Sequence, residues 1–231
     1  QAQLAYRMTG AYSVLREQFQ QAVAHFEGVA AALARIAGLT YLIEATRRFT
    51  VTAVDASLKP ALASSIAKYH MTEFARTIVN DAMDIHGGRG IQMGPRNYLA
   101  QGYIAIPISI TVEGANILTR NLILFGQGAV RCHPYLRDEM DAITKKDMVS
   151  LDKLLIEHFS YSFKNLLKTF SFAFGLGHFF VDTPIKELSY YYRQISRLSA
   201  ALALVTDFTL IILGGSLKRK ERLSARLGDV L

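Results

Sequence analysis

Apolar residues recur at a helical spacing along most of this chain, and only 5 prolines interrupt the pattern. This periodicity predicts an all-α fold, because a helix presents the same face every three or four residues. One stretch runs from Phe26 to about Thr52, and a second begins near Pro60 and ends at Gly87 and Gly88. The first stretch is apolar almost all round in its middle, so we expect it to be buried among other helices. Long helices with short connections are typical of a helical bundle.

The second half of the chain changes in composition. Charged residues crowd into positions 138–147, which we interpret as a linker between domains. We therefore predict a bundle domain over residues 1–140 and a helical extension over residues 141–231. Within the extension, residues 198–215 form an apolar run with one charge, Asp207. A charge near the middle of the run favours a bundle helix, or a helix on an anionic surface, over a membrane span.

The net charge of the chain limits the classes of ligand that it is expected to bind. Lys and Arg number 26 against 19 Asp and Glu, and a net charge of +7 suggests nucleic acid, an anionic membrane or a phosphate-bearing ligand. The basic residues do not gather around a base-reading element, so no nucleic-acid partner is predicted. A hydrophobic fraction of 51% excludes disorder for most of the chain. With the single Cys132 and six dispersed histidines, we predict neither a disulfide scaffold nor a metal site.

A glycine-rich turn, Gly87-Gly88-Arg89-Gly90, follows the second predicted helix. A phosphate loop of the Walker type would need a following Lys-Ser/Thr, and a dinucleotide fold would need a preceding strand; neither is present. Two interpretations remain open. The glycines either cap the helix and start a turn, or let backbone N–H groups approach a phosphate with Arg89 as counter-charge.

Glu113 is the only formally charged residue between Arg96 and Arg120, and it lies in an apolar run. A carboxylate in such a run is either exposed at a kink or buried at a cost that serves some function. A buried carboxylate without a cationic partner is a candidate general base. No second carboxylate lies nearby, so paired-acid chemistry of the glycosidase type is unsupported.

Arg16 and Phe19 lie where a first helix gives way to a loop-like stretch before Phe26. An arginine in this position can hold a phosphate with two parallel hydrogen bonds. An exposed arginine at a helix end is the commoner case, and the sequence leaves both alternatives open.

Taken in order on an all-helical chain, Arg16-x-x-Phe19, segment 85–90 and segment 112–114 resemble the C-terminal helical domain of acyl-CoA dehydrogenases. The resemblance covers about residues 4–139. It implies a bundle of four helices that run alternately up and down.

Segment 110–134 is most similar to the large bacterial membrane-associated acyl-CoA dehydrogenases of fatty-acid β-oxidation. Those proteins carry a long C-terminal extension, and residues 142–231 resemble part of it. The resemblance implies a bacterial cytoplasmic protein with peripheral contact to the inner membrane. Basic residues on both sides of the apolar run, among them Arg197 and Lys218, fit such a contact.

The resemblance implies a flavoprotein that desaturates fatty acyl-CoA to trans-2-enoyl-CoA. In that reaction Glu113 is the catalytic base that takes the α-proton while a hydride leaves the β-carbon for FAD, and Gly114 contacts the substrate. The site must exclude water and polarise the thioester carbonyl, partly through the main-chain N–H of the base itself. The electrons then pass to an acceptor protein similar to electron-transfer flavoprotein.

The resemblance also assigns residues to FAD held by a neighbouring subunit, which implies a homodimer or a dimer of dimers. These cofactor residues are Arg16, Glu17, Gln18, Phe19, Asp84, Ile85, His86, Gly87, Gly88, Gly90, Ala115, Asn116 and Ile117. Two positions depart from the family pattern. Gln20 stands where many relatives have Gly, and Ala115 stands where many have Thr.

The first residue is Gln1, and we expect the chain to be a piece of a longer protein. The family's N-terminal helical domain and middle β-domain are absent from these residues, so we expect residues 1–231 alone to have no dehydrogenase activity. The alternative function is a non-catalytic helical module for oligomerisation or membrane docking. Failure of the full-length protein to bind flavin would favour that alternative.

Overall fold

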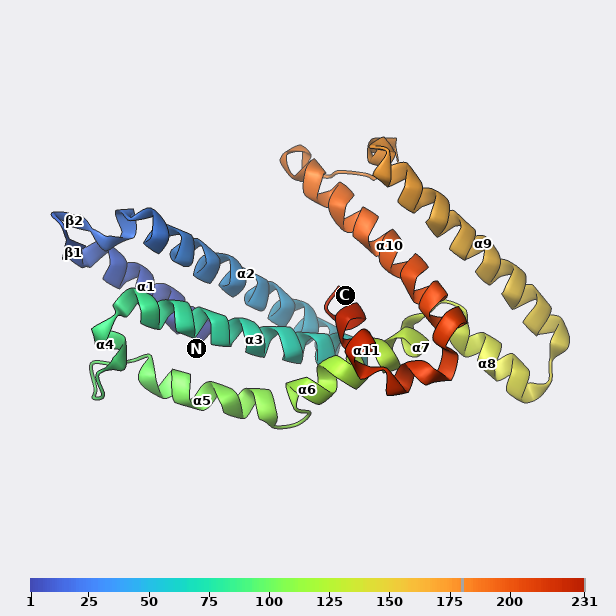
Figure 1. The fold of residues 1–231 in the computed structure, drawn as a ribbon, viewed down its shortest axis with the longest axis horizontal. Helices are drawn as coiled ribbons and strands as arrows, with labels where there is room; N and C mark the ends of the chain where they lie inside the picture. Colours follow the sequence, from blue (N-terminus) through green and yellow to red (C-terminus); the bar gives the residue numbers. More distant parts are fainter. Residues whose placement is uncertain (180, 231) are drawn as a thin grey trace. The chain divides into compact units, whose positions relative to one another are not determined.

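The computed structural model describes residues 1–179 and 181–230 and divides the chain into two compact units (Figure 1). Unit 1 is Gln1–Thr119 and unit 2 is Arg120–Leu231. The division lies earlier than the boundary expected at 140/141. Each unit has its own packed interior, and each is described by itself below.

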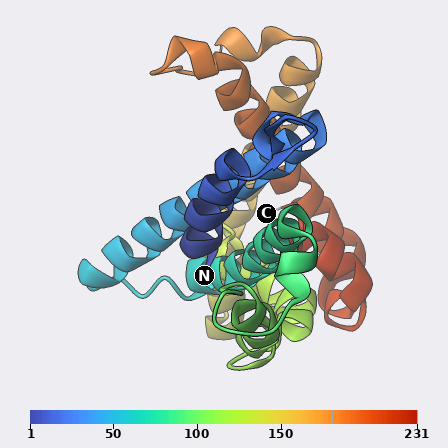
Figure 2. The same cartoon turned by 90° about the vertical axis from the view of Figure 1, so that its left-hand side faces the viewer.

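Unit 1 is a bundle of four long helices that run in alternating directions, as Figures 1 and 2 both show. They are α1 (Ala2–Leu15), α2 (Glu27–Asp55), α3 (Ala61–His86) and α5 (Ala100–Thr111). Short elements connect them: β1 (Glu17–Gln18), β2 (Gln21–Ala22), η1 (Val23–His25), α4 (Gly88–Ile91) and α6 (Asn116–Leu118). The predicted all-α bundle is confirmed. Helix α3 packs against α1, α2 and α5, so it is the scaffold on which the rest of unit 1 is positioned.

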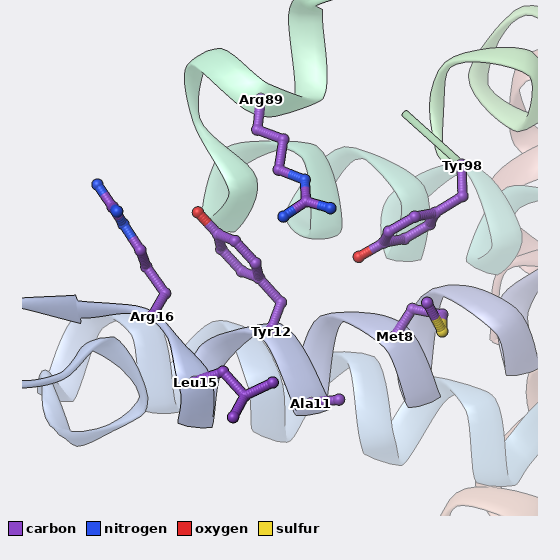
Figure 3. A pocket seen from close by; sticks show the side chains of 7 residues that line it. All are labelled: Met8, Ala11, Tyr12, Leu15, Arg16, Arg89 and Tyr98. Atoms are coloured by element: carbon purple, nitrogen blue, oxygen red, sulfur yellow. The ribbon is translucent and has the colours of Figure 1, made fainter. Parts of the chain in front are cut away.

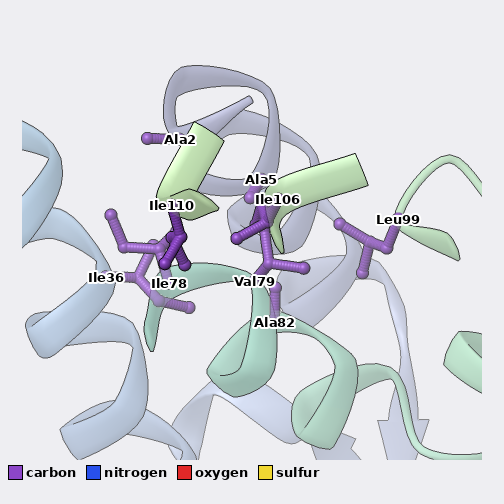
Figure 4. Close-up of a cluster of buried hydrophobic side chains, with 9 residues drawn as sticks. All are labelled: Ala2, Ala5, Ile36, Ile78, Val79, Ala82, Leu99, Ile106 and Ile110. Carbon is purple, nitrogen blue, oxygen red and sulfur yellow. The ribbon is translucent and has the colours of Figure 1, made fainter. Parts of the chain in front are cut away.

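The core of unit 1 consists of small and branched side chains from all four helices (Figure 4). They are Ala2, Ala5, Ile36, Ile78, Val79, Ala82, Leu99, Ile106 and Ile110. Ile36 and Ile78 are fully buried, and burial of such a side chain contributes about 1.5–3 kcal/mol. Alanines on α1 and α3 let the helices approach closely, which fixes the position of α1 against α3.

Helix α2 differs from its prediction. Only Ile36 and Thr40 are buried on it, whereas Tyr41 and Phe49 are 76% and 66% exposed. The expectation that α2 is buried all round is therefore wrong for this chain. One face of α2 packs on α1 and α3, and its other apolar faces lie open.

Unit 2 consists of helices of several kinds. They are the π-helix η2 (Thr119–Gln127), α7 (Gly128–Cys132), α8 (Leu136–Lys145), α9 (Met148–Ala173), η3 (Leu176–Phe179), η4 (Lys186–Leu188), α10 (Ser189–Leu213), η5 (Gly214–Arg219) and α11 (Glu221–Gly228). Helices α9 and α10 form the longest contact. Phe125, Leu217 and Leu227 form a second core that joins η2, η5 and α11.

The predicted linker at 138–147 is a helix. Its segment forms α8, which packs against α9 and buries Ala142 while its charged residues lie mostly outside. Lys146 ends α8 with a left-handed backbone (φ 57), and the carboxylate of Asp147 caps α9 by accepting from the backbone N–H of Ser150 at 3.1 Å. The charged residues recur at a helical spacing, so they form the outer face of an amphipathic helix and not a linker.

Two helical segments, 27–55 and 186–219, are long and apolar enough to cross a bilayer by length and composition. The second contains the predicted apolar run. Its charge, Asp207, is buried within unit 2, and α10 packs along α9 as a bundle helix does.

Candidate functional site

The chain leaves α1 through a tight hairpin. Arg16 takes an extended backbone at the end of α1, and strands β1 and β2 pair Gln18 with Gln21. The two turn residues, Phe19 and Gln20, both have positive φ angles, 51° and 64°. That geometry belongs to a type I′ turn, which favours Gly at both central positions. Phe19 stands out from the turn, 89% exposed.

The structure explains why glycine is required at two positions of the predicted turn. Gly87 ends α3 with φ 56 and ψ −132, a conformation that side chains disfavour. A Cβ at Gly90 would lie 3.0 Å from the carbonyl oxygen of Met83, so this glycine lets α4 approach α3. The helix-cap interpretation is therefore confirmed. It is compatible with phosphate contact, because Gly87 and Gly88 are exposed.

The glycine turn and the end of α1 meet at one pocket (Figure 3). It is lined by Met8, Ala11, Tyr12, Leu15, Arg16, Arg89 and Tyr98 and has a volume of about 320 Å³. Arg89 lies over the Tyr12 ring, 5.4 Å from its centroid. Within residues 1–179 and 181–230, neither Arg16 nor Arg89 has a carboxylate within ion-pair distance. Two arginines without acidic partners make this pocket suited to an anion.

His86 forms the buried floor beside this pocket. Its Nδ1–H donates to the carbonyl oxygen of Ala82 at 2.8 Å, which leaves Nε2 to accept from the Tyr98 hydroxyl. The ring stacks on Tyr12, with centroids 4.2 Å apart. Burial lowers the pKa of His86 below its ordinary value of 6.5, so the ring is neutral. The predicted cofactor residue His86 thus supports the ring of Tyr12, which lines the pocket. Tyr12 could not be predicted from the sequence, because a single aromatic residue on a helix face belongs to no motif.

The other residues predicted from segment 84–90 lie elsewhere. Asp84 and Gly87 line a separate pocket of about 520 Å³ together with Ile91 and Tyr103. Ile85 packs against the core of unit 1. The structure therefore divides the predicted cofactor residues between two pockets.

Glu113 lies on a loop directly after α5. The helix ends at Thr111, and Glu113 and Gly114 then adopt positive φ angles of 48° and 96°. The Glu113 side chain is exposed, so the structure selects the kink among the two alternatives. A left-handed backbone at a residue other than glycine costs about 1–2 kcal/mol and persists only where neighbouring contacts enforce it.

Those contacts come from Lys68 on α3, which the sequence analysis did not single out. Its ammonium donates to the carbonyl oxygens of Ile110 (3.2 Å) and Gly114 (2.6 Å) and to Oδ1 of Asn116 (2.6 Å). Burial lowers the pKa of Lys68, and the nearby Glu73 carboxylate opposes that effect. Lys68 thus binds the chain on both sides of Glu113.

The three predicted cofactor residues after Glu113 differ in exposure. Asn116 is 3% exposed, and its side-chain amide is occupied by α3: Nδ2 donates to Oγ1 of Thr72 at 2.9 Å and to Oε1 of Glu73 at 2.8 Å. Ile117 is 78% exposed and Ala115 is half-buried. A cofactor contact from Asn116 is therefore left to its main chain.

Unit 2 brings together three side chains that the sequence treated as dispersed. Ligand atoms of His133, His158 and Asp207 lie within 4.8 Å of one another. However, Nδ1 of His133 accepts from the backbone N–H groups of Tyr135 (3.2 Å) and Leu136 (3.3 Å), so its proton lies on Nε2. That Nε2–H donates to Asp207 at 2.8 Å. The three side chains therefore form a hydrogen-bonded cluster and not a metal site. The lone pair of His133 that could bind a metal is on Nδ1, which faces the backbone and not the other two side chains.

The cluster stabilises a buried charge. Burial raises the pKa of Asp207, but hydrogen bonds from His133, Ser162 and His158 outweigh burial and hold it below its ordinary value. The Ser162 hydroxyl donates at 2.6 Å. Asp207 therefore ties α10 to α9 and, through His133, to the turn between α7 and α8 as an ionised carboxylate.

Comparison with known proteins places both units in one class, the helical C-terminal regions of an oxidoreductase family. Residues 1–126 match the family described as "Acyl-CoA dehydrogenase, C-terminal domain", and residues 130–231 match "Acyl-CoA dehydrogenase, C-terminal, bacterial type". The chain belongs to the acyl-CoA dehydrogenase family. The resemblance found in the sequence is thereby confirmed.

A solved structure shares this fold. It is an acyl-CoA dehydrogenase complexed with FAD from Bacillus anthracis, with a TM-score of 0.71 and 19% sequence identity. The match covers 99% of this chain and 38% of the other, so this chain spans well under half the length of that protein.

Proposed function

We propose that the chain is the C-terminal part of a FAD-dependent acyl-CoA dehydrogenase that desaturates fatty acyl-CoA to trans-2-enoyl-CoA in β-oxidation. The observation that carries the proposal is the exposed carboxylate of Glu113, presented on a strained loop that α3 holds from both sides. Strain of this kind is concentrated at functional sites.

In this reaction Glu113 accepts the α-proton of the thioester as the β-hydrogen leaves with its electron pair. Bound FAD supplies the hydride acceptor. The backbone N–H of Glu113 donates to the thioester carbonyl, which stabilises the negative charge that develops there. Gly114 adjoins this point and leaves room for the thioester. The remaining domains of the protein and the substrate itself cover Glu113 and exclude water from it.

The residues present fit an anionic cofactor. Arg16 and Arg89 line one pocket without carboxylate partners, and Phe19, three residues after Arg16, exposes an aromatic surface. These residues would hold the diphosphate half of FAD from a second subunit, which makes the protein a homodimer or a dimer of dimers. A separate acceptor protein, similar to electron-transfer flavoprotein, takes the electrons.

We further propose that unit 2 contacts the cytoplasmic face of a bacterial inner membrane. Phe159, Phe163, Phe170 and Phe174 are at least half exposed, and their spacing places them on one face of α9. Lys164, exposed on the same helix, supplies positive charge. An aromatic face with basic neighbours suits an anionic lipid surface.

The catalytic role of Glu113 is tested in the full-length flavoprotein by Glu113→Gln. The variant keeps bound yellow flavin, but acyl-CoA bleaches it about 10²–10⁴-fold more slowly, because the amide cannot accept the α-proton. Stopped-flow absorbance measures the rate. Glu187→Gln, an exposed glutamate of unit 2, is the matched control and bleaches normally.

Equal bleaching rates in Glu113→Gln and the wild type would remove Glu113 from the mechanism. A full-length protein without flavin would instead favour the non-catalytic helical module.

A further inference from the structure

The ammonium of Lys68 lies where the chain turns out of α5. Two of its acceptors, the carbonyls of Ile110 and Gly114, flank Glu113 along the chain, and the third is the side chain of Asn116. The last carbonyls of a helix lack partners within the helix, and a cation there satisfies them. One side chain thus fixes both the end of α5 and the exit of the Glu113 loop.

The end of the loop after Glu113 is also held by α3, through the side chain of Asn116. Asn116 accepts from Lys68 and donates to Thr72 and Glu73, so its amide has partners in both directions. Lys68 and Thr72 are four residues apart and share one helix face. Because α3 packs against α1, α2 and α5, the loop takes its position from the helix that contacts all the others in the bundle.

We propose that Lys68 is a positioning residue that fixes the carboxylate of Glu113 against the α-carbon of the substrate; this rests on the proposed function. In this role Lys68 acts through the loop that it holds and not by contact with substrate or flavin. Without its ammonium, the three acceptors lose this donor, and among the described residues the side-chain bonds that still hold the Glu113 loop are those from Thr119 to Gly114 and from Asn116 to Thr72 and Glu73. The carboxylate then moves out of line with the proton it must take.

The experiment uses the full-length, FAD-bound protein and the variants Lys68→Met and Lys68→Arg. In Lys68→Met, flavin bleaching at saturating acyl-CoA slows about 10²-fold, the loss expected when a reacting group is misplaced by about 1 Å. The acyl-CoA concentration for half-maximal rate changes less than about threefold, since binding contacts are intact. Lys68→Arg retains most of the rate, because guanidinium also donates to several carbonyls.

A second readout separates positioning from general damage. With acyl-CoA deuterated at the α-carbon, the isotope effect on bleaching rises in Lys68→Met, because proton transfer becomes the slow step. A merely unstable variant would show less bound flavin but an unchanged rate and isotope effect per flavin, and that result overturns the proposal.

A milder matched pair covers the case in which Lys68→Met does not fold. Thr72→Val removes the hydroxyl that accepts from Asn116, whereas Thr77→Val removes one that bonds only its own helix, at Glu73. We expect slower bleaching in Thr72→Val and normal bleaching in Thr77→Val; equal rates overturn the proposal.

The outcomes also separate the Lys68 proposal from the proposed function. The Lys68 proposal alone fails if acyl-CoA bleaches the wild type and Lys68→Met at the same rate but does not bleach Glu113→Gln. A wild type that acyl-CoA cannot bleach contradicts the proposed function itself.

Discussion

The imidazole of His86 is buried beneath Tyr12 and held in its neutral form. Burial places its folded-state pKa below 6.5, so the unfolded chain takes up the proton first as the pH falls. The free energy of unfolding therefore decreases from about pH 6.5 down to the folded-state pKa.

Urea unfolding at about pH 7.5 and about pH 5.5 tests this linkage. The wild type loses stability at the lower pH, and His86→Phe, which cannot titrate, loses less. His25→Phe is the control, because His25 is exposed and the variant should keep the full pH dependence. An identical pH dependence in His86→Phe and the wild type would contradict the prediction.

Single residues also show how much of the candidate site can be predicted from the sequence. Arg16, the glycine turn and Glu113 could be singled out from the sequence because each belongs to a motif. Lys68 could not, because its role depends on contacts with residues more than 40 positions away that only the packing of α3 against α5 creates. The left-handed backbone of Glu113 was equally hidden, since nothing about a glutamate predicts a positive φ.

Helix α4 rests on α3 through a contact that tolerates no side chain. In Gly90→Ala, the new Cβ meets the carbonyl oxygen of Met83 at 3.0 Å, and backbone cannot move aside as a flexible side chain can. We expect a loss of about 1–3 kcal/mol in the free energy of unfolding. Gly88→Ala is the matched control, because no atom lies within 4 Å of its added Cβ. Chemical denaturation measures both, and equal stabilities would refute the close-approach argument.

At the level of elements, periodicity located α2 and α3 because their apolar residues repeat along a face. It did not locate α5, whose apolar residues surround the helix and whose Pro107 reads as a break. It mistook α8 for a linker because charge was counted without regard to its phase around a helix. The presence of a helix can be predicted from the local pattern of apolar residues. The boundary between the two units depends on tertiary packing, which cannot be read from the sequence.

The molecule as a whole exposes more surface than its mass requires. Two separate folded bodies sharing a mass of 25.7 kDa would together expose about 12,600 Å², whereas this chain exposes 15388 Å². Large apolar side chains lie exposed on α2, α9 and α10. We infer that these faces are covered by further protein or by lipid.

Lipid contact through α9 is tested with vesicles. We expect residues 1–231 to co-sediment with anionic vesicles, to bind zwitterionic ones less and to be released by salt. Phe174→Glu weakens binding because it places a charge on the aromatic face. Phe49→Glu, at a comparably exposed position on α2, is the control. Binding that ignores vesicle charge, or that responds equally to both variants, would count against a membrane role.

The paired arginines of the pocket between α1 and α4 have a thermodynamic consequence. Both arginines line the pocket, and an anion bound there gains favourable interactions with their positive charges. A ligand that binds only the folded, assembled protein stabilises it by about 2.7 kcal/mol at a concentration one hundred times its Kd. Under the proposed function, in which FAD is held between subunits, cofactor supply and subunit association would be reciprocal: dilution would release the cofactor, and cofactor scarcity would lower the amount of protein that survives in the cell.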